Sequence, residues 1–426
     1  MIRMSQKPKE LNGGMTVKVD KRKLPEGWKW VKLGEVLAYE QPNKYIVKDE
    51  QYDKRHGIPV LTPGKTFILG FTQEHQGIYN NIPVIIFDDF TTESRYIAFP
   101  FKLKSSAVKI LRSKCNFVNL YYVYNSMQLL NFKPGSEHKR FWISEYSKFL
   151  IPLPPLPEQR KIAEILETID NAIEKTDAII EKYKRIKQGL MQDLLTKGVV
   201  SEGEGESERW RLRDENIDKF KDSPLGRIPE EWEVVRLGEV VDITMGQSPP
   251  SESYNMEGKG MPFLQGKQEF ESKHPVEVKY TTKPLKIAFE NSLLISVRAP
   301  VGDVNIANKT YCIGRGLASL SAKKGIIALF LYYLMTFQKS NVEAIGEGST
   351  FQAIARSQIF NFKIPLPLPC EQQHIASILS QIDEVIEKEQ AYKEKLERIK
   401  KGLMEDLLTG KLRVNHLIEE EDKDGN

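Results

Sequence analysis

Lysine, arginine and glutamine side chains gather at several points of this chain, and their types suit contact with a nucleic acid. Arginine, lysine and glutamine can bridge purine edges in the major groove, and the two cations also neutralise phosphates. Residues 21–157 hold 20 Lys and Arg against 12 Asp and Glu, while the second half is nearly balanced. The candidate contact residues are Lys102, Lys104, Lys139, Arg140, Lys267, Gln268, Arg298, Arg315, Gln352 and Arg356. For each of them, a solvated surface charge or amide is the alternative interpretation.

Three short motifs point to enzymatic chemistry only weakly. Gly64-Lys65-Thr66 ends like a phosphate-binding loop, but Pro59 stands where that motif needs a glycine, so a turn is the better interpretation. Glu277-Val278-Lys279 has the Glu-x-Lys form of many magnesium nucleases, without a convincingly placed second acid. Ser248-Pro249-Pro250-Ser251 is similar to the Pro-Pro loop of amino-methyltransferases, but it lacks that loop's first polar residue and its aromatic residue.

Metal chemistry and membrane insertion also lack support in the sequence. The three cysteines, Cys115, Cys312 and Cys370, are widely spaced, and the six histidines form neither an HExxH motif nor a pair at helical spacing. The longest apolar run, from Ile326 to Met335, has about ten residues where a membrane helix needs about twenty. We therefore expect a cytoplasmic protein with no metal site and no cofactor of its own.

The chain repeats the borders of one unit twice. Leu24 to Val36 recurs as Ile228 to Val240, and the proline-rich segment from Ile151 to Ile162 recurs, 213 residues later, from Ile364 to Ile375. The segment from Gly189 to Thr196 also returns at the same offset. The interiors, 37–150 and 241–363, share little. This pattern predicts two similarly built halves whose central parts have different tasks.

Each repeat ends in a segment with the apolar spacing of one long helix. In 158–198 the apolar side chains fall on alternating steps of four and three, with Thr176 and Lys187 as breaks. In 371–412 the breaks are Glu389, Lys393 and Lys400. A lone helix of about 40 residues is poorly stable in water, so we expect the two to pack together. Because a short polar linker follows the first helix, the second is expected to run antiparallel to it.

The interiors are predicted to mix strands and helices, which makes the fold class α+β. Strands are indicated at 82–87 and 292–298, and helices at 117–130 and 326–339. The expected organisation is a flexible N-terminus (1–20), a first globular domain (21–157), a first helix (158–198), a linker (199–209), a second globular domain (210–370), a second helix (371–412) and a flexible acidic tail (413–426). A pseudo-two-fold axis would relate the two halves.

The repeated motifs resemble a known family. The Trp-x-x-Val-x-Leu-Gly-Glu opening, the Ile-Pro-Leu-Pro exit with its Glu-Gln pair and the Leu-Leu-Thr helix end are similar to the specificity subunits of type I restriction-modification systems. Gly302-Asp-Val, Gly314-Arg-Gly-Leu317 and Gly348-Ser-Thr350 also resemble their target recognition domains. The first domain lacks a clear counterpart of Gly314-Arg-Gly-Leu317.

This resemblance implies a non-catalytic subunit that reads a DNA target in two parts. Each variable domain would bind one half of the target, and the antiparallel helices would set the spacing. The implied partners are double-stranded DNA, methyltransferase subunits and ATP-dependent restriction subunits, with S-adenosylmethionine and ATP bound by those partners. Two alternatives stay open: a self-contained nuclease or methyltransferase, and a coiled-coil scaffold protein.

Overall fold

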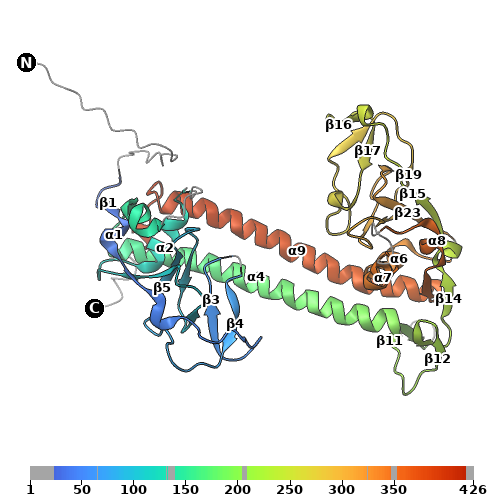
Figure 1. Cartoon of the computed structure of the whole chain (residues 1–426), viewed down its shortest axis with the longest axis horizontal. Coiled ribbons are helices and arrows are strands. Elements are labelled where there is room, and N and C mark those ends of the chain that lie inside the picture. Colours follow the sequence, from blue (N-terminus) through green and yellow to red (C-terminus); the bar gives the residue numbers. More distant parts are fainter. Residues whose placement is uncertain are drawn as a thin grey trace, which may run out of the picture. The chain divides into compact units, whose positions relative to one another are not determined.

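The structure is a computed structural model, and it describes residues 24–64, 66–130, 132, 140–203, 209–323, 325–346 and 353–418. Residues 1–177 and 392–426 form one compact unit, and residues 178–391 form a second (Figure 1). These are called unit 1 and unit 2. Each contains a head, meaning its sheets and short helices, and a segment of both long helices. The N-terminal segment expected to be flexible, 1–20, lies outside the described residues.

Two sheets form the head of unit 1. The main sheet is antiparallel, with the order β2 (Leu37–Glu40), β8 (Val108–Ser113), β5 (Val84–Asp88), β6 (Ser94–Ile97). The second sheet has the order β4 (Ile68–Thr72), β3 (Ile58–Leu61), β7 (Lys102–Leu103), and β3 pairs with β7 in parallel. A further pair joins β1 (Lys29–Lys32) to β9 (Leu150–Leu153), so the two repeated border segments of this half lie side by side.

The head of unit 2 repeats the strand order of the main sheet, whereas its second sheet has five strands in place of three. Its main sheet has the order β15 (Val241–Met245), β23 (Leu317–Ala322), β20 (Leu293–Ser296), β21 (Val304–Ile306). Its second sheet has the order β16 (Tyr254–Asn255), β18 (Lys279–Thr281), β17 (Met261–Leu264), β22 (Tyr311–Ile313), β19 (Ile287–Ala288). As in unit 1, one pair of the second sheet is parallel, here β17 with β22. β14 (Glu233–Arg236) and β24 (Lys363–Leu366) form the border pair. Interiors with little sequence in common therefore share the strand order of the main sheet.

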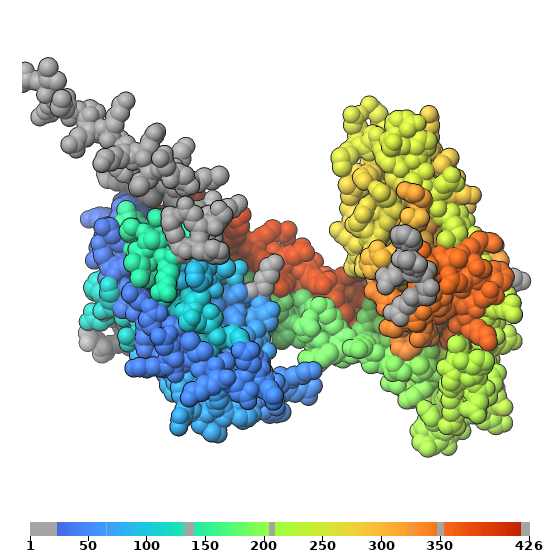
Figure 2. Space-filling view, in the orientation of Figure 1, coloured from blue at the N-terminus to red at the C-terminus, as the bar shows by residue number. Residues whose placement is uncertain are grey.

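Short helices cover the main sheets, and the predicted strands and helices inside the heads are confirmed. The strands expected at 82–87 and 292–298 are β5 and β20, and the helices expected at 117–130 and 326–339 contain α2 (Leu120–Gln128) and α6 (Ala328–Phe337). Smaller helices complete the heads: α1 (Leu33–Val36), α3 (Phe141–Ser144), α5 (Leu237–Val240), α7 (Lys339–Gly346) and α8 (Arg356–Asn361). In Figures 1 and 2 the second sheet of unit 2, in yellow, lies on the far side of its head from the long helices.

The long helices α4 (Leu156–Thr196) and α9 (Pro369–Leu407) pack antiparallel within each unit. In unit 1, Lys400 pairs with Asp170 at 2.5 Å and Lys393 pairs with Asp177 at 2.7 Å, so residue numbers rise along α4 as they fall along α9. In unit 2, Lys187 pairs with Asp383 at 2.5 Å. The predicted antiparallel pairing is confirmed. α9 ends at Leu407, before the expected residue 412, and is followed by Gly410 with φ +75°.

A buried carboxylate in the first turn of α4 holds the head of unit 1 to the helices. The Trp28 indole nitrogen donates to Glu158 at 2.9 Å, and Arg413 donates to both carboxylate oxygens at 2.6 and 2.9 Å. Arg413 follows the end of α9, so the chain that leaves one helix closes over the start of the other. Trp28, Glu158 and Arg413 are called the Glu158 cluster.

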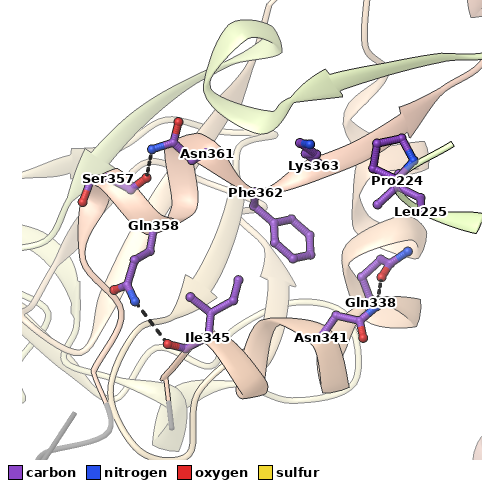
Figure 3. A pocket seen from close by; sticks show the side chains of 10 residues that line it. All are labelled: Pro224, Leu225, Gln338, Asn341, Ile345, Ser357, Gln358, Asn361, Phe362 and Lys363. Atoms are coloured by element: carbon purple, nitrogen blue, oxygen red, sulfur yellow. Dashed lines mark hydrogen bonds between the residues drawn. The ribbon is translucent and has the colours of Figure 1, made fainter. Parts of the chain in front are cut away.

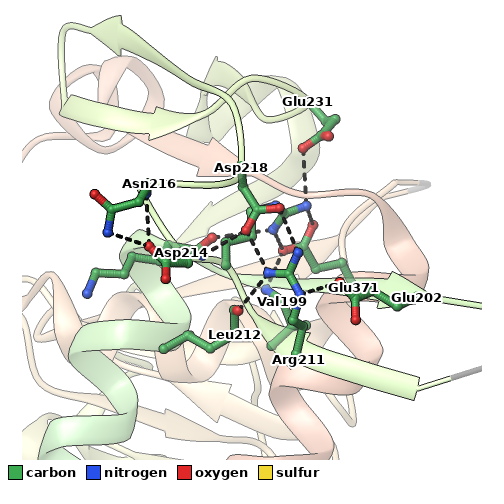
Figure 4. Close-up of polar contacts among 11 residues, drawn as sticks. Val199, Glu202, Arg211, Leu212, Asp214, Asn216, Asp218, Glu231 and Glu371 are labelled. Atoms are coloured by element: carbon green, nitrogen blue, oxygen red, sulfur yellow. Dashed lines mark hydrogen bonds and ion pairs between the residues drawn. The ribbon is translucent and has the colours of Figure 1, made fainter.

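Unit 2 contains the same arrangement around Glu371, which follows Glu158 by 213 residues (Figure 4). Glu371 of α9 accepts from the Trp232 indole at 3.0 Å and from the Val199 backbone N–H at 2.8 Å, and Arg213 donates to both of its oxygens. Arg213 follows the end of α4 through the hairpin of β10 (Val199–Glu202) and β11 (Arg209–Leu212). These residues form the Glu371 cluster. Each head is thus bound to the first turn of one long helix and to the segment that follows the end of the other long helix.

Two sequence-based boundaries are corrected by these contacts. Residues 413–418 are not a free tail, because Arg413 bonds to Glu158 and Val414 is buried, whereas 419–426 lie outside the described residues. The segment expected to be a plain linker, 199–209, contains β10. It is followed by a second hairpin, β12 (Phe220–Ser223) with β13 (Gly226–Pro229), before the head of unit 2 begins.

Candidate nucleic-acid interface

Loops from both sheets of unit 2 meet on one face of its head. The turn between β22 and β23 bonds to the end of β17 through Gly314 N–H to the Leu264 carbonyl, 2.7 Å, and Gly316 N–H to the Gln265 carbonyl, 3.3 Å. The same turn accepts from the Val297 N–H, after β20, at 2.9 Å. Loops far apart in the sequence therefore present their side chains together.

Close backbone contact at this junction requires glycine. A Cβ at Gly246 would overlap the Gly314 carbonyl oxygen, and a Cβ at Gly316 would lie 2.8 Å from the Gln265 carbonyl oxygen. Arg315 stands between two of these close approaches, with its backbone N–H 3.4 Å from the Ser248 hydroxyl. The Gly-Arg-Gly segment thus forces the arginine side chain out of a turn that is packed on both sides.

We expect Gly246→Val to displace this turn and to lower the free energy of unfolding by about 1–3 kcal/mol, the usual cost of overpacking. Urea unfolding of the full chain measures the change. Gly266→Val is the matched control, because a Cβ at Gly266 meets nothing within 4 Å and the residue is extended at φ −171°. Equal losses for the two variants would contradict the close-packing argument.

Several predicted contact residues of unit 2 surround this junction. Arg298 and Arg315 are exposed, and neither guanidinium has a partner among the described residues. Arg298 forms a bridge with Ala353, and Ile354 N–H donates to the Val297 carbonyl at 3.0 Å, which brings the start of α8 to the same place. Arg356, the first residue of α8, is exposed and lies 3.5 Å from the Ile243 carbonyl. Gln352 lies outside the described residues.

Amide side chains fix the start of α8. A hollow of about 720 Å³ separates α8, α7 and the β12–β13 hairpin (Figure 3). On its wall the Gln358 amide donates to the Ile345 carbonyl at 3.1 Å, and its oxygen accepts from the Ala355 N–H at 2.8 Å. Gln358 therefore both caps α8 and ties it to α7, which holds Arg356 beside the junction.

Lys267 and Gln268 lie on the loop after β17. The Lys267 ammonium is 2.5 Å from the Asp303 carboxylate, which also accepts from Lys339 at 2.7 Å. Burial alone would raise the pKa of Asp303, but the two lysines outweigh it and the pKa is lowered. Lys339 also lies 3.7 Å from the Glu343 carboxylate, so the two cations of this group face two carboxylates. Gln268 is exposed, and its amide donates to the Glu269 carboxylate at 2.9 Å.

The head of unit 1 builds the corresponding face from different side chains. Lys104 N–H donates to the Leu61 carbonyl at 3.2 Å, as Gly314 does to Leu264 in unit 2. Phe141 N–H donates to the Asp89 carbonyl at 2.9 Å, as Ile354 does to Val297. By these matched bonds, Lys104 takes the place of Gly314, and Arg140, just before Phe141, takes the place of Ala353, just before Ile354.

The predicted contact residues of unit 1 differ in how exposed they are. Arg140 is exposed, and Lys104 is partly exposed and paired with Glu50. Lys139 lies outside the described residues. Lys102 is wrong as a surface contact, because it is buried with its ammonium 2.5 Å from Glu74 and 2.7 Å from the Gln76 carbonyl. A bond from the Asp49 N–H, together with Lys102, lowers the pKa of Glu74 to about 2.

Sequence reasoning missed two groups on these faces. Arg95 of β6 is exposed and lies over the Phe67 ring at 5.7 Å, beside the β3–β4 loop. Gln265, at the junction in unit 2, accepts from the Lys279 ammonium at 3.1 Å. Neither belongs to a charge run or a glycine motif. Only the pairing of distant strands brings them to the interface.

The competing chemistry gains no support from the described part of the chain. Glu277, the acid of the Glu-x-Lys motif, bonds to Lys309 at 2.7 Å and to the Tyr280 hydroxyl at 3.0 Å. The described residues contain no group of three His, Cys, Asp or Glu side chains placed to hold a metal ion. Among them, no helix combines the length and apolar character needed to span a membrane.

A family model of the type I restriction modification DNA specificity domain matches the chain twice, over residues 25–184 and 229–398. The two matches include most of each head and much of each long helix. The chain belongs to this family. The expectation drawn from the repeated border motifs is therefore confirmed, including the two-domain α+β organisation with long paired helices.

Curated relatives of this chain are specificity subunits. The EcoR124I/EcoR124II specificity subunit of Escherichia coli is 31% identical over 373 residues, which are 83% of this chain and 86% of that protein. The MjaVIII specificity subunit of Methanocaldococcus jannaschii is 28% identical and covers 93% of this chain and 95% of its own length. The putative MjaX specificity subunit of the same organism reaches 48% identity, but the match spans 62% of this chain and 59% of that protein.

Solved structures agree with this assignment. A chain from a study of complex assembly and conformational transition in the type I restriction-modification system has 26% identity and a TM-score of 0.52, with coverage of 92% of this chain and 100% of that one. The S subunit from M. genitalium has a TM-score of 0.61 at 13% identity and covers 91% of this chain. The second likeness concerns the fold alone.

Proposed function

We propose that this specificity-domain protein recognises a two-part DNA sequence as the non-catalytic specificity subunit of a type I restriction-modification complex. The observation that carries the proposal is the double family match over two heads whose main sheets have the same strand order. Each head brings loops from two sheets to one face that carries basic and amide side chains. Such side chains can read base edges and contact phosphates.

Each head would read its own half-site, because the two faces differ in chemistry. The face in unit 2 offers Arg298, Arg315 and Arg356 around a glycine junction, with Lys267 and Gln268 beside it. The face in unit 1 offers Lys104 and Arg140, with Arg95 as an addition. Gln352 and Lys139, which lie outside the described residues, are further candidates for the two half-sites. The planar guanidinium of arginine can donate two parallel hydrogen bonds to guanine, whereas the compact ammonium of lysine suits phosphate more generally. We therefore expect two unrelated half-site sequences.

The helix pair would set the gap between the half-sites and dock methyltransferase subunits. Methyl transfer and cleavage would belong to those subunits and to ATP-dependent restriction subunits, so this chain needs no cofactor of its own. Its site of action would be the cytoplasm, where partner subunits and DNA meet.

Selection of duplexes from a random pool by the full chain tests this proposal. We expect a consensus of two short sequences separated by a gap of fixed length. Affinity for the selected duplex should fall by about 10³ or more between 50 and 200 mM salt if six or more phosphates are contacted. The isolated chain should neither cut the duplex with Mg²⁺ nor transfer a labelled methyl group. A pool that yields no split consensus would count against the function, and catalysis by the isolated chain would favour an enzyme.

A further inference from the structure

The same polar triad occurs once in each unit, where a helix of the head meets both long helices. In unit 1 the Tyr121 hydroxyl, on α2, donates to Asp170 of α4, and Lys400 of α9 pairs with the same carboxylate at 2.5 Å. In unit 2 the Tyr333 hydroxyl, on α6, donates to Asp383 of α9 at 2.7 Å. Lys187 of α4 completes this second triad at 2.5 Å.

The contact is repeated even though the tyrosine position is not. Asp170 and Asp383 are related by the 213-residue offset of the repeat, and so are Lys187 and Lys400. The head helices can be aligned by a second duplicated contact. Gln159 accepts from the Asn119 N–H and donates to the Phe117 carbonyl, and Gln372 does the same with Ile327 and Gly325.

In that alignment Tyr333 corresponds to Asn125, whereas Tyr121 stands four residues earlier, one helical turn away on the same face. Two unlike head helices thus place a tyrosine hydroxyl on the same aspartate from different turns. A repeat inherited with its residues would have kept the position of the tyrosine. The bond from a tyrosine hydroxyl to this aspartate is present in both units, although the tyrosine comes from different helical turns. We infer that the bond itself is required.

The triad attaches each head to the helix pair away from its other polar contacts. The Glu158 or Glu371 cluster and the bonds of Gln159 or Gln372 lie in the first turn of one long helix, and the triad aspartate lies 12 residues beyond the cluster glutamate on the same helix. Twelve helical residues correspond to about 18 Å along the axis and about 120° around it. Apolar side chains of both long helices also pack into the core of each head, but such packing is not directional. A directed bond at a different height and direction therefore fixes the rotation of the head more firmly than the contacts of the first turn alone.

The surroundings of the triads make these bonds strong. The Asp383 and Lys187 side chains are 14% and 21% exposed, and the Lys187 ammonium also lies over the Tyr333 ring at 5.4 Å. Burial, followed by the bond to Asp383, raises the pKa of Tyr333 well above its usual range, so the hydroxyl stays a donor. In unit 1, Asp170 and Lys400 are 28% and 25% exposed. Half-buried, charge-assisted bonds of this kind are little weakened by solvent.

We propose that Asp170 and Asp383 are positioning residues for DNA recognition, which fix the rotation of each head on the helix pair and thereby make the protein selective for one gap length between the half-sites. This inference rests on the proposed function. One added base pair turns a half-site by about 35° and moves it by about 3.4 Å. A head with fixed rotation meets the displaced half-site poorly, whereas a head free to turn can follow it.

The test removes one hydroxyl at a time from the full chain. Tyr121→Phe and Tyr333→Phe each break the head-to-aspartate bond. Tyr122→Phe and Tyr332→Phe are matched controls on the neighbouring residues, because their hydroxyls donate within the head, to the Pro152 carbonyl at 2.8 Å and the Ser272 carbonyl at 3.2 Å. The probes are duplexes with both selected half-sites and gaps one base pair shorter, equal and one base pair longer.

We expect the wild type and both controls to prefer the selected gap by tenfold or more, about the cost of one mismatched position. Tyr121→Phe and Tyr333→Phe should reduce that ratio to about threefold or less, with the half-site sequences unchanged. Because the readout is a ratio, a uniform loss of affinity does not imitate it. If a phenylalanine variant fails to fold, Asp170→Ala or Asp383→Ala, which removes the acceptor of the same bond, replaces it.

A gap preference that stays at its wild-type value in the variants that lack the tyrosine hydroxyl or the aspartate carboxylate would overturn the positioning role while leaving the proposed function intact. Equal relaxation in Tyr122→Phe and Tyr332→Phe would also overturn it, because the effect would then follow from the loss of any buried hydroxyl. If the wild type selects no split consensus, the proposed function itself fails.

Discussion

Glu371→Ala is expected to lower the free energy of unfolding of unit 2 by about 3 kcal/mol, the lower end of the cost of breaking a buried ion pair, because Arg213 keeps only the exposed carboxylate of Glu231 at 3.2 Å. Arg213 is 6% exposed and Glu371 4% exposed. The same carboxylate accepts from the Trp232 indole and the Val199 N–H, and these donors would lose their acceptor as well. Urea unfolding followed by hydrogen exchange of unit 2 amides measures the loss.

Glu158→Ala is the matched comparison in unit 1, and its cost should be smaller. Arg413 is 29% exposed, so water can hydrate its guanidinium once the carboxylate is gone. The Trp28 indole would still lose its acceptor. Glu371→Gln, which retains an acceptor but not the charge, should fall between the two. Equal losses for Glu158→Ala and Glu371→Ala would show that burial of the arginine does not control the effect.

The repeated borders and the long helices could be predicted because their signals are local. Apolar spacing requires only that neighbouring turns face the same way, and the side chains at Ile162, Leu166, Ile375 and Leu379 are indeed buried. Three of the residues that interrupt the apolar spacing form ion pairs, which the spacing alone cannot reveal. Lys187, Lys393 and Lys400 each pair with an aspartate of the opposite helix.

Other features depend on contacts between residues far apart in the chain. Lys102 belongs to a run of basic residues, but it lies inside the head because Glu74 and the Gln76 carbonyl hold its ammonium. Arg413 is in a polar tail by composition, yet its partner Glu158 is 255 residues away. Composition identifies charge, whereas only the pairing of distant strands and helices decides which charges remain on the surface.

Arg315→Ala is expected to reduce affinity for the selected duplex by about 10- to 100-fold, the usual value of one bidentate base contact. Its guanidinium is exposed, has no partner among the described residues and stands in a turn fixed by close backbone contact. Loss of this side chain should relax selection at one or two positions of one half-site. The other half-site should be selected as before, because the head of unit 1 is unchanged.

Arg227→Ala controls for the removal of any arginine from unit 2. Arg227 is 55% exposed on the β12–β13 hairpin, outside the loops of the interface.

Arg315→Lys distinguishes a base contact from a phosphate contact, because lysine preserves the charge but not the planar guanidinium. If Arg315 contacts a base, Arg315→Lys should lose selectivity at the same base positions as Arg315→Ala, while the salt dependence of binding stays near that of the wild type. If Arg315 contacts phosphate alone, Arg315→Lys should bind the selected duplex with nearly wild-type affinity, and neither variant should change the selected sequence.

An Arg315→Ala variant that binds DNA like Arg227→Ala would contradict the prediction. The glycine junction would then lie outside the interface, and other loops would read that half-site.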